Sequence, residues 1–270
     1  MINSSEEYNR LFQLNNSFEW LKPKSKELFE LWELLENENQ KLLITELINK
    51  FLFLNNENIS YACQAIINQI TKIWNLSHEN TFLISSADSS EADGSQFVLY
   101  FVKRMLPDNW GAFNQYNNII TAAHEIPING NYVIIDDFIG TGTTMLARVN
   151  YLDKILKQRE SRNSQFYIVS TACMQFAKEK LAPYLTFSPY YLKKGISEHF
   201  EGEKLVLMKS EMKKIEKKLF NNKNRFNFGY KKSEALISIM DLNTPNNVFP
   251  IFWYPKLICG KKRNPIFIRK

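Results

Sequence analysis

The first third of the chain has the pattern of helices. Between residues 24 and 76, apolar side chains recur every three or four positions, which is the spacing of one face of an α-helix. They form three groups, at residues 28–35, 42–51 and 62–74. Ser25 and Asn58 suit the first turn of a helix, because a short polar side chain can accept a hydrogen bond from an unpaired amide there. The pattern therefore predicts three helices in this part of the chain.

The pattern changes near residue 80 to short runs rich in β-branched and aromatic residues, which predict strands. These runs lie at residues 81–86, 118–123, 132–137 and 165–173. Helical patterns separate them, most clearly at 95–106 and 143–158. Such alternation predicts an α/β fold, with a mostly parallel sheet flanked by helices.

We therefore divide the chain into three parts. Residues 1–78 form an N-terminal helical extension and residues 79–192 an α/β core. Residues 193–270 form a basic C-terminal region, which we expect to pack on that core.

Composition narrows the class of protein. The chain has 270 residues, of which 44% are hydrophobic, and this is enough to bury a core. No apolar run reaches the roughly 20 residues that cross a bilayer, and the first residues are polar and acidic, unlike a secretory signal. The three cysteines lie far apart, so neither a disulfide framework nor a zinc site is indicated. We expect a cytoplasmic protein with no membrane partner.

The net charge of +6 is unevenly distributed. Residues 1–58 hold 6 Lys/Arg and 10 Asp/Glu, whereas residues 193–232 hold 12 Lys/Arg and 5 Asp/Glu. The basic segment can attract a nucleic acid or an acidic partner protein, or it can be the solvated face of a helix. Helical spacing would align four of its lysines in one strip: Lys213, Lys214, Lys217 and Lys218.

The stretch NYVIIDDFIGTGTTM at residues 131–145 carries the clearest chemistry. Asp136 and Asp137 follow an apolar run, and glycines and threonines come next, before a helix that begins near Thr143. Unpaired amides and the partial positive charge of a helix N-terminus favour a phosphate. The phosphate-binding candidates are Gly140, Thr141, Gly142, Thr143 and Thr144. The two acids suit ribose hydroxyls or Mg²⁺, so a sugar that carries a phosphate would satisfy both halves.

Two other phosphate-binding motifs do not fit this stretch. A Walker loop needs a lysine that the stretch lacks, and a dinucleotide fingerprint needs a glycine where Met145 stands. A purely structural turn, with acids at the end of a strand, is the remaining alternative.

This stretch resembles the phosphoribosyl-pyrophosphate (PRPP) motif of type I phosphoribosyltransferases, in which apolar residues, two acids, a short linker and TGxT follow one another. The resemblance implies a parallel sheet over roughly residues 80–190 and a Mg²⁺-dependent transferase. It implies that the residues of the TGTT loop bind the 5′-phosphate. It also implies that Asp136 and Asp137 face the ribose hydroxyls and act in catalysis.

A longer likeness includes residues 85–104 and 242–255. These segments resemble the phosphoribosyltransferase-like domain (PRTase-CE) of prokaryotic conflict and antiphage systems, some of them linked to retrons. The likeness covers most of the chain after residue 20. It implies that the protein is an effector of bacterial antiphage defence.

The chain departs from the transferase pattern at three places. Where the hypoxanthine and guanine enzymes of the family carry an aspartate that assists proton transfer at the purine, this chain has Gly140, which disfavours a 6-oxopurine substrate. The pyrophosphate loop of the family corresponds to residues 85–96, where the candidates are Ser86, Asp88, Ser89, Ser90, Asp93, Gly94 and Ser95. Acidic residues replace the expected basic ones in this loop, so it repels bare pyrophosphate unless a metal intervenes. The loop before the motif strand is shortened to HEIPING, residues 124–130, without Lys or Arg.

Two hypotheses follow from these observations. The first is an enzyme that transfers a phosphoribosyl group to a base or nucleotide, with PRPP or a nucleotide as its small-molecule partner. The second is a catalytically inactive, nucleotide-binding scaffold that engages nucleic acid or a partner protein. His124 is a candidate acid, base or leaving-group contact, and Phe249, Phe252 and Trp253 are candidates either for stacking on a base or for closing the core.

Overall fold

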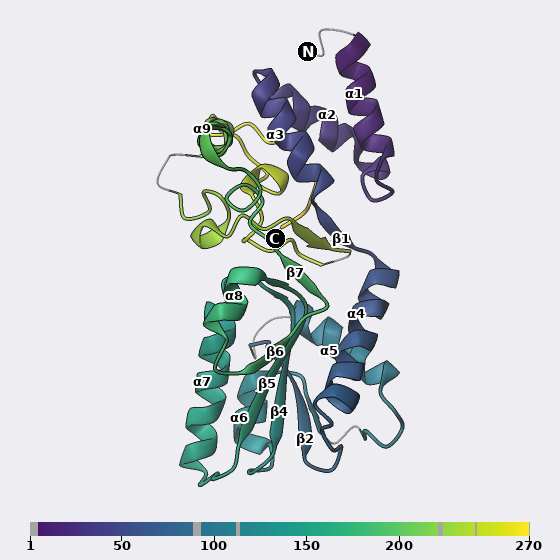
Figure 1. Ribbon diagram of the computed structural model, residues 1–270, viewed down its shortest axis with the longest axis vertical. Coiled ribbons are helices and arrows are strands. Elements are labelled where there is room, and N and C mark those ends of the chain that lie inside the picture. The colour runs from purple at the N-terminus through teal and green to yellow at the C-terminus, as the bar shows by residue number, and fades with distance from the viewer. Residues whose placement is uncertain (1–4, 89–92, 112–113, 221–223, 241, 270) are drawn as a thin grey trace. The chain divides into compact units, whose positions relative to one another are not determined.

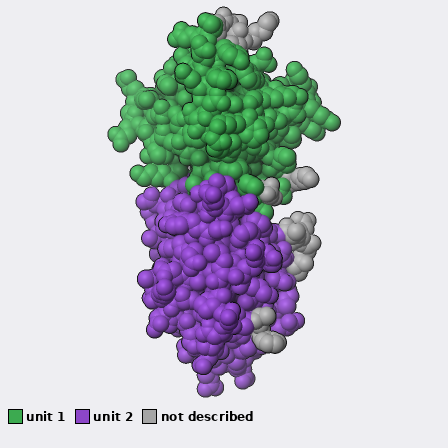
Figure 2. All heavy atoms as spheres, turned by 90° about the vertical axis from the view of Figure 1, so that its right-hand side faces the viewer, with its two compact units in different colours: residues 1–54, 193–270 green, residues 55–192 purple. Residues whose placement is uncertain are grey.

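The computed structural model describes residues 5–88, 93–111, 114–220, 224–240 and 242–269. Within these ranges, no helix is both long and apolar enough to cross a membrane. The chain forms two compact units, one made of residues 1–54 and 193–270 and the other of residues 55–192 (Figure 2). The second unit contains the motif at residues 131–145.

A parallel six-stranded sheet forms the centre of the second unit. Its strands are β2 (Thr81–Ser85), β3 (Gln115–Tyr116), β4 (Asn131–Ile139), β5 (Gln165–Met174), β6 (Leu185–Phe187) and β7 (Tyr190–Leu192). The order is β3-β2-β4-β5-β6, and β7 pairs with β5 beyond the end of β6. Residues 132–135 of β4 are all buried, as expected for a central strand covered on both faces.

Helices cover both faces of this sheet. They are α4 (Asn56–Asn68), α5 (Gly94–Met105), α6 (Ile119–Glu125), α7 (Thr143–Gln158) and α8 (Gln175–Lys180), and α4 continues into a π-helical turn at Gln69–Ile73. In Figure 1, α4 and α5 lie on one side of the sheet and α6 and α7 on the other. The fold is α/β, with a parallel sheet flanked by helices.

Helix α4 belongs to the sheet unit, although the sequence-based boundary at residue 78 would separate the two. It packs against α5 and β5 through Ile59, Ile66 and neighbouring buried side chains. The Asn55 side chain accepts a hydrogen bond from the Asn58 amide, and the Asn58 side chain accepts one from the Asn55 amide. Asn55 is therefore the N-cap, and α4 begins at Asn56, two residues before Asn58.

The strand expected at residues 118–123 is wrong, because this segment is helix α6. The Asn118 side chain accepts a hydrogen bond of 2.7 Å from the Thr121 amide and so caps the helix. Ile119, Ala122 and Ala123 are buried at helical spacing. The strand that pairs with β2 on this side is the two-residue β3. The apolar residues that indicated a strand instead form the buried face of helix α6.

The first unit joins the two ends of the chain. It contains α1 (Ser5–Asn16), α2 (Ser25–Glu33), α3 (Glu38–Asn49), β1 (Leu52–Leu54), α9 (Gly202–Lys217) and β8 (Ile237–Ile239), with 3₁₀ turns at Lys22–Lys24, Tyr230–Lys232 and Pro250–Phe252. Strands β1 and β8 pair in parallel, with Leu52 opposite Ile237. Helices α3 and α9 pack together, and the buried Glu211 of α9 accepts hydrogen bonds from Gln40 (3.0 Å) and Asn37 (3.2 Å).

A second buried carboxylate on α9, that of Glu216, has no cationic partner among the described residues. The backbone N–H of Phe228 donates to both of its oxygens, at 3.0 and 3.1 Å. Burial raises the pKa of Glu216 to about 8, and the nearby Glu234 carboxylate acts in the same direction. This acid is therefore held in its neutral form over much of the physiological pH range.

Glu216 makes the stability of the protein fall as the pH rises. The unfolded chain loses the proton near its ordinary pKa of 4.5 and the folded chain near 8, so the folded state binds more protons between these values. We expect Glu216→Gln, which mimics the neutral acid, to stabilise the protein at pH 8 but not at pH 4.5. The gain at pH 8 should be on the order of 1–3 kcal/mol in the free energy of unfolding.

Urea unfolding of both proteins across this pH range measures the difference. Exposed Glu203 lies on the same helix, and Glu203→Gln serves as the control. If the difference in the free energy of unfolding between wild type and Glu216→Gln does not change with pH, Glu216 is not a buried neutral acid.

Candidate functional site

Strand β4 carries both acids of the motif near its carboxyl end. On one side its neighbour β2 stops at Ser85, which pairs with Ile135. On the other side β5 continues the ladder, with Ser170 opposite Asp136. Asp136 and Asp137 therefore lie just beyond the end of β2, where they are half-buried. In open parallel sheets, this carboxyl edge is where ligands bind.

Asp93 meets the two acids of β4 from the start of helix α5. Its carboxylate caps the helix and accepts hydrogen bonds from the Ser95 amide (2.8 Å) and hydroxyl (2.6 Å). Carboxylate oxygens of Asp93, Asp136 and Asp137 lie within 4.8 Å of one another. Gly94 permits this approach, because a Cβ atom at that position would collide with the Asp137 carboxylate. We call these three residues the acid cluster.

The two acids of β4, Asp136 and Asp137, resist ionisation. Loss of hydration raises the pKa of Asp136 well above its ordinary value, and the charge of Asp137 and then that of Asp93 raise it further, whereas a hydrogen bond from Ser86 lowers it. The pKa of Asp137 is raised mainly by loss of hydration, and the charge of Asp93 acts in the same direction. Such a cluster gains stability from any divalent cation that shares its oxygens.

The composition of the acid cluster fits a hard cation. Mg²⁺ prefers oxygen ligands and keeps several waters, so one or two carboxylates are enough to hold it. Asp136 and Asp137 were the metal ligands expected from the sequence, and in the structure the carboxylate of Asp93 lies beside theirs.

The loop after β4 presents the N-terminus of α7. Gly142 is the N-cap residue, with a φ of 69° that disfavours other residues. The Thr141 hydroxyl donates to that of Thr143 at 3.2 Å, and Thr144 is exposed. With the buried Gly140, these residues form what we call the phosphate cradle, because the first amides of a helix and adjacent hydroxyls favour an anion.

The pyrophosphate-loop candidates take separate roles in the structure. The hydroxyl of the buried Ser86 bonds to Asp136, and that of Ser95 bonds to Ser85 at 2.6 Å. Asp88 forms an ion pair of 2.8 Å with Arg148 of α7. Ser89, Ser90 and Glu91 lie outside the described residues.

His124 stands apart from the acid cluster, and the C-terminal aromatic residues belong to the core of the first unit. His124 lies in the last turn of α6, shortly before the amino end of β4, and the acid cluster lies toward the other end of that strand. Phe249, Phe252 and Trp253 are almost fully buried and close the core of the first unit, as one of the two interpretations expected.

Two of the four candidate lysines of α9 are paired with acids. Lys214 contacts Glu211 at 2.6 Å, and Lys218 contacts Glu36 at 2.8 Å. Lys213 and Lys217 are exposed. Of the four lysines in the strip that the sequence suggested, only these two have no ion pair with another described residue, and they lie one helical turn apart.

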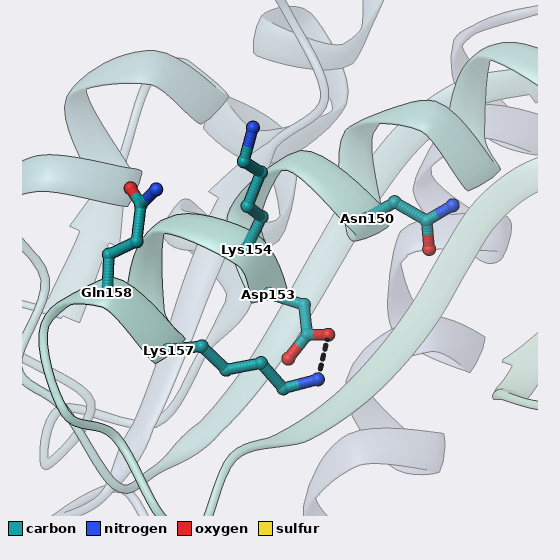
Figure 3. Close-up of a pocket in the computed structure, with 5 residues that line it drawn as sticks. All are labelled: Asn150, Asp153, Lys154, Lys157 and Gln158. Carbon is teal, nitrogen blue, oxygen red and sulfur yellow. Dashed lines mark hydrogen bonds and ion pairs between the residues drawn. The ribbon is translucent and has the colours of Figure 1, made fainter.

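A shallow hollow on the surface of α7 lies apart from the acid cluster and the phosphate cradle. Its volume is about 510 Å³, and it is lined by Asn150, Asp153, Lys154, Lys157 and Gln158. Figure 3 shows these side chains projecting from successive turns of α7, with Lys157 and Asp153 joined by an ion pair of 2.7 Å. None of its lining residues belongs to the motif.

Sequence reasoning did not single out two basic residues that the fold brings to the site. Arg148 on α7 contacts Asp88, and Lys180 at the end of α8 contacts the hydroxyl of Thr143 at 2.7 Å. Lys180 follows the strand adjacent to β4, and loops after adjacent parallel strands meet at one edge of a sheet. This rule indicates that the segment after β5 lies near the motif, but it does not indicate which residue of that segment reaches the site.

Comparison with known proteins points to one family. A family model described as PRTase-CE matches residues 29–269, which includes the acid cluster and the phosphate cradle. No match was found among curated proteins. Among solved structures, the chain is similar to the orotate phosphoribosyltransferase from Aeropyrum pernix, with 15% sequence identity and a TM-score of 0.31. That alignment covers 48% of this chain and 68% of the other.

The raised pKa values of Asp136 and Asp137 imply that their charges destabilise the metal-free protein. We expect Asp136→Asn to raise the melting temperature by a few degrees at neutral pH in a chelating buffer. In wild type the backbone N–H of Asp137 donates a hydrogen bond of 3.0 Å to the Asp136 carboxylate. The side-chain oxygen of an asparagine at position 136 can still accept this bond, and the repulsion between the charges is removed. Differential scanning calorimetry measures the shift.

Asp153→Asn on α7 is the matched control, because this acid lies outside the cluster and pairs with Lys157. A melting temperature lower in Asp136→Asn than in Asp153→Asn would contradict the unfavourable electrostatics of the cluster.

Proposed function

The chain belongs to the PRTase-CE family, and we propose that it binds PRPP, or a nucleotide with a ribose 5-phosphate, at the carboxyl edge of its sheet. Membership of this family supports a phosphoribosyltransferase-like function. The observation that carries the finer proposal is the adjacency of two opposite environments on one strand-loop-helix segment. The acid cluster attracts cations and hydroxyl donors, and the phosphate cradle attracts anions a few residues later.

The two environments match the two halves of a phosphorylated sugar. The phosphate would accept hydrogen bonds from the first amides of α7 and from the hydroxyls of Thr141, Thr143 and Thr144. Asp136 and Asp137 would then accept hydrogen bonds from the ribose hydroxyls. Positive charge develops on the ribose as its anomeric bond breaks, and two fixed carboxylates stabilise that charge more than they stabilise the neutral ground state.

We include Mg²⁺ in the proposal, held by Asp136 and Asp137 with Asp93 beside them. When bound, the ion would neutralise the charge of a pyrophosphate leaving group. The phosphate cradle would hold the other end of the sugar. The ion pair between Asp88 and Arg148 offsets one negative charge of the pyrophosphate loop, which would face the leaving group.

We further propose that the protein is the effector of a bacterial antiphage defence system. The support is the likeness to PRTase-CE domains of prokaryotic conflict systems, which extends over both units of the chain. An effector that consumes PRPP or a nucleotide would deprive a replicating phage of nucleic-acid precursors.

The double variant Asp136→Asn/Asp137→Asn tests the enzyme. Both asparagines keep the size of the side chain and remove its charge, so the fold should persist. We expect wild type to bind PRPP more tightly with Mg²⁺ than without it, and the variant to lose this dependence with at least about tenfold weaker binding. Isothermal titration calorimetry with PRPP and ribose 5-phosphate, each with and without Mg²⁺, measures both effects.

Release of pyrophosphate and protection of cells against phage are measured on the same proteins, with Asp153→Asn as control. The double variant should lose both activities, and the control should keep them. Undiminished phage protection by the double variant would argue against an enzyme at this site.

The second candidate function is an inactive nucleotide-binding scaffold that engages nucleic acid or a partner protein. The acidic residues of the pyrophosphate loop favour it, together with exposed Lys213 and Lys217 on α9, which lie one turn apart. No carboxylate of the described residues lies within ion-pair distance of these two lysines. A nucleic acid backbone is the polyanion that such a strip fits.

Charge reversal at Lys213 and Lys217 distinguishes the scaffold from a solvated helix. If they contact a backbone, Lys213→Glu/Lys217→Glu should weaken binding to RNA or DNA and reduce the slope of log affinity against log salt by about two units. Lys214→Glu/Lys218→Glu is the comparison, since these lysines already pair with acids. Fluorescence anisotropy at several salt concentrations gives the slopes. Equal, negligible binding by all three proteins would remove nucleic acid as a partner of α9.

A further inference from the structure

Helix α8 forms a wall beside the phosphate cradle. It follows β5 without a loop, and its residues pack against the N-cap of α7. A Cβ atom at Gly142 would lie 3.4 Å from the Ala177 carbonyl oxygen and 3.5 Å from Leu181. The cradle is therefore bounded by α8, which comes from a different strand than the motif itself.

The two lysines of α8 point to different surroundings. The ammonium of Lys178 lies over the ring of Tyr191, 4.9 Å from its centroid. The ammonium of Lys180 donates a hydrogen bond of 2.7 Å to the hydroxyl of Thr143, the first residue of α7. Lys180 thus adds a full positive charge to a cradle that otherwise consists of amides and hydroxyls.

This position is unfavourable for a cation when the cradle holds no anion. The N-terminus of α7 carries a partial positive charge, which repels an ammonium in the first turn. Within the described ranges, no carboxylate lies within ion-pair distance of Lys180 to offset that repulsion. An anion in the cradle would interact favourably with both the ammonium of Lys180 and the N-terminus of α7.

We propose that Lys180 binds the phosphate of the ligand and makes the site specific for a phosphate monoester on the sugar. This inference rests on the proposed function, since it concerns the same cradle. An ammonium has three protons to donate, and only one is used in the bond to Thr143. The remaining two are directed to phosphate oxygens, and the charge of Lys180 selects a dianionic group over a neutral hydroxyl at the 5′ position.

The test compares Lys180→Gln with Lys178→Gln by calorimetry. Ribose 5-phosphate is the probe, because it carries the phosphate without the pyrophosphate and needs no metal. We expect Lys180→Gln to weaken its binding by about 10-fold to 100-fold, the effect of losing a charged hydrogen bond. Lys178→Gln should leave it unchanged. Lys180→Arg should restore most of the affinity, because it restores the charge.

The melting temperature of the ligand-free proteins separates binding from a structural role. Lys180 also lies in the last turn of α8, where a cation stabilises the helix. If that is its only role, Lys180→Gln will melt earlier than wild type and bind ribose 5-phosphate equally well, which overturns the inference. We expect instead an unchanged or higher melting temperature together with weaker binding.

Failure of the inference can be distinguished from failure of the proposed function. If wild type binds neither ribose 5-phosphate nor PRPP, the cradle itself is wrong and the role of Lys180 fails with it. If wild type binds ribose 5-phosphate and Lys180→Gln binds it with the same affinity, the proposed function stands and only the role of Lys180 is refuted.

Discussion

The close approach of helix α5 to strand β4 at Gly94 is the contact on which the site depends. Because residue 94 has no side chain, the Asp137 carboxylate can occupy the space where a Cβ would lie. The same approach brings Asp93, the cap of α5, to the acids of β4. A helix cap and two strand residues thereby become one cluster, in which lost hydration and the charge of neighbouring acids raise the pKa values of Asp136 and Asp137. Such repulsion is unfavourable for stability and is typical of sites that bind cations or substrates.

The local charge of the site changes from negative to positive within a few residues. Strand β4 carries two acids near its carboxyl end, and the loop after Ile139 turns at Gly142 to present the positive end of α7. Two further contacts set the charge balance, because Arg148 neutralises Asp88 and Lys180 adds to the positive side. The ligand that we propose, a phosphorylated sugar, carries both hydroxyls and a phosphate, and so it offers a partner to each of the two charged environments.

The first unit is stabilised in a different way. Its two chain segments are joined by the β1–β8 pair and by buried polar groups, among them Glu211, which bonds to two residues at the start of α3. Glu211 and Glu216 of α9 occupy buried positions that apolar residues usually hold. Glu216 can be buried there because it stays neutral. The stability of this unit is therefore coupled to pH through groups far in sequence from the motif.

The sequence by itself determined the strands β2, β4 and β5, the helices α5 and α7, and a turn before Thr143, because periodicity and local turn chemistry fix these from neighbouring residues. It ended β4 two residues too early, since the strand continues past Asp137 to Ile139 by pairing with β5. It did not determine α6, where the cap at Asn118 outweighed an apolar run that resembled a strand. Asp93 could be assigned to a loop but not to the acid cluster, and Lys180 could not be assigned at all. Their places depend on which strands pair and on where β2 stops, at Ser85 opposite Ile135. Likewise, only the tertiary structure joins Leu52 to Ile237, because contacts between residues so far apart are selected by the packing of the whole unit rather than by any local pattern.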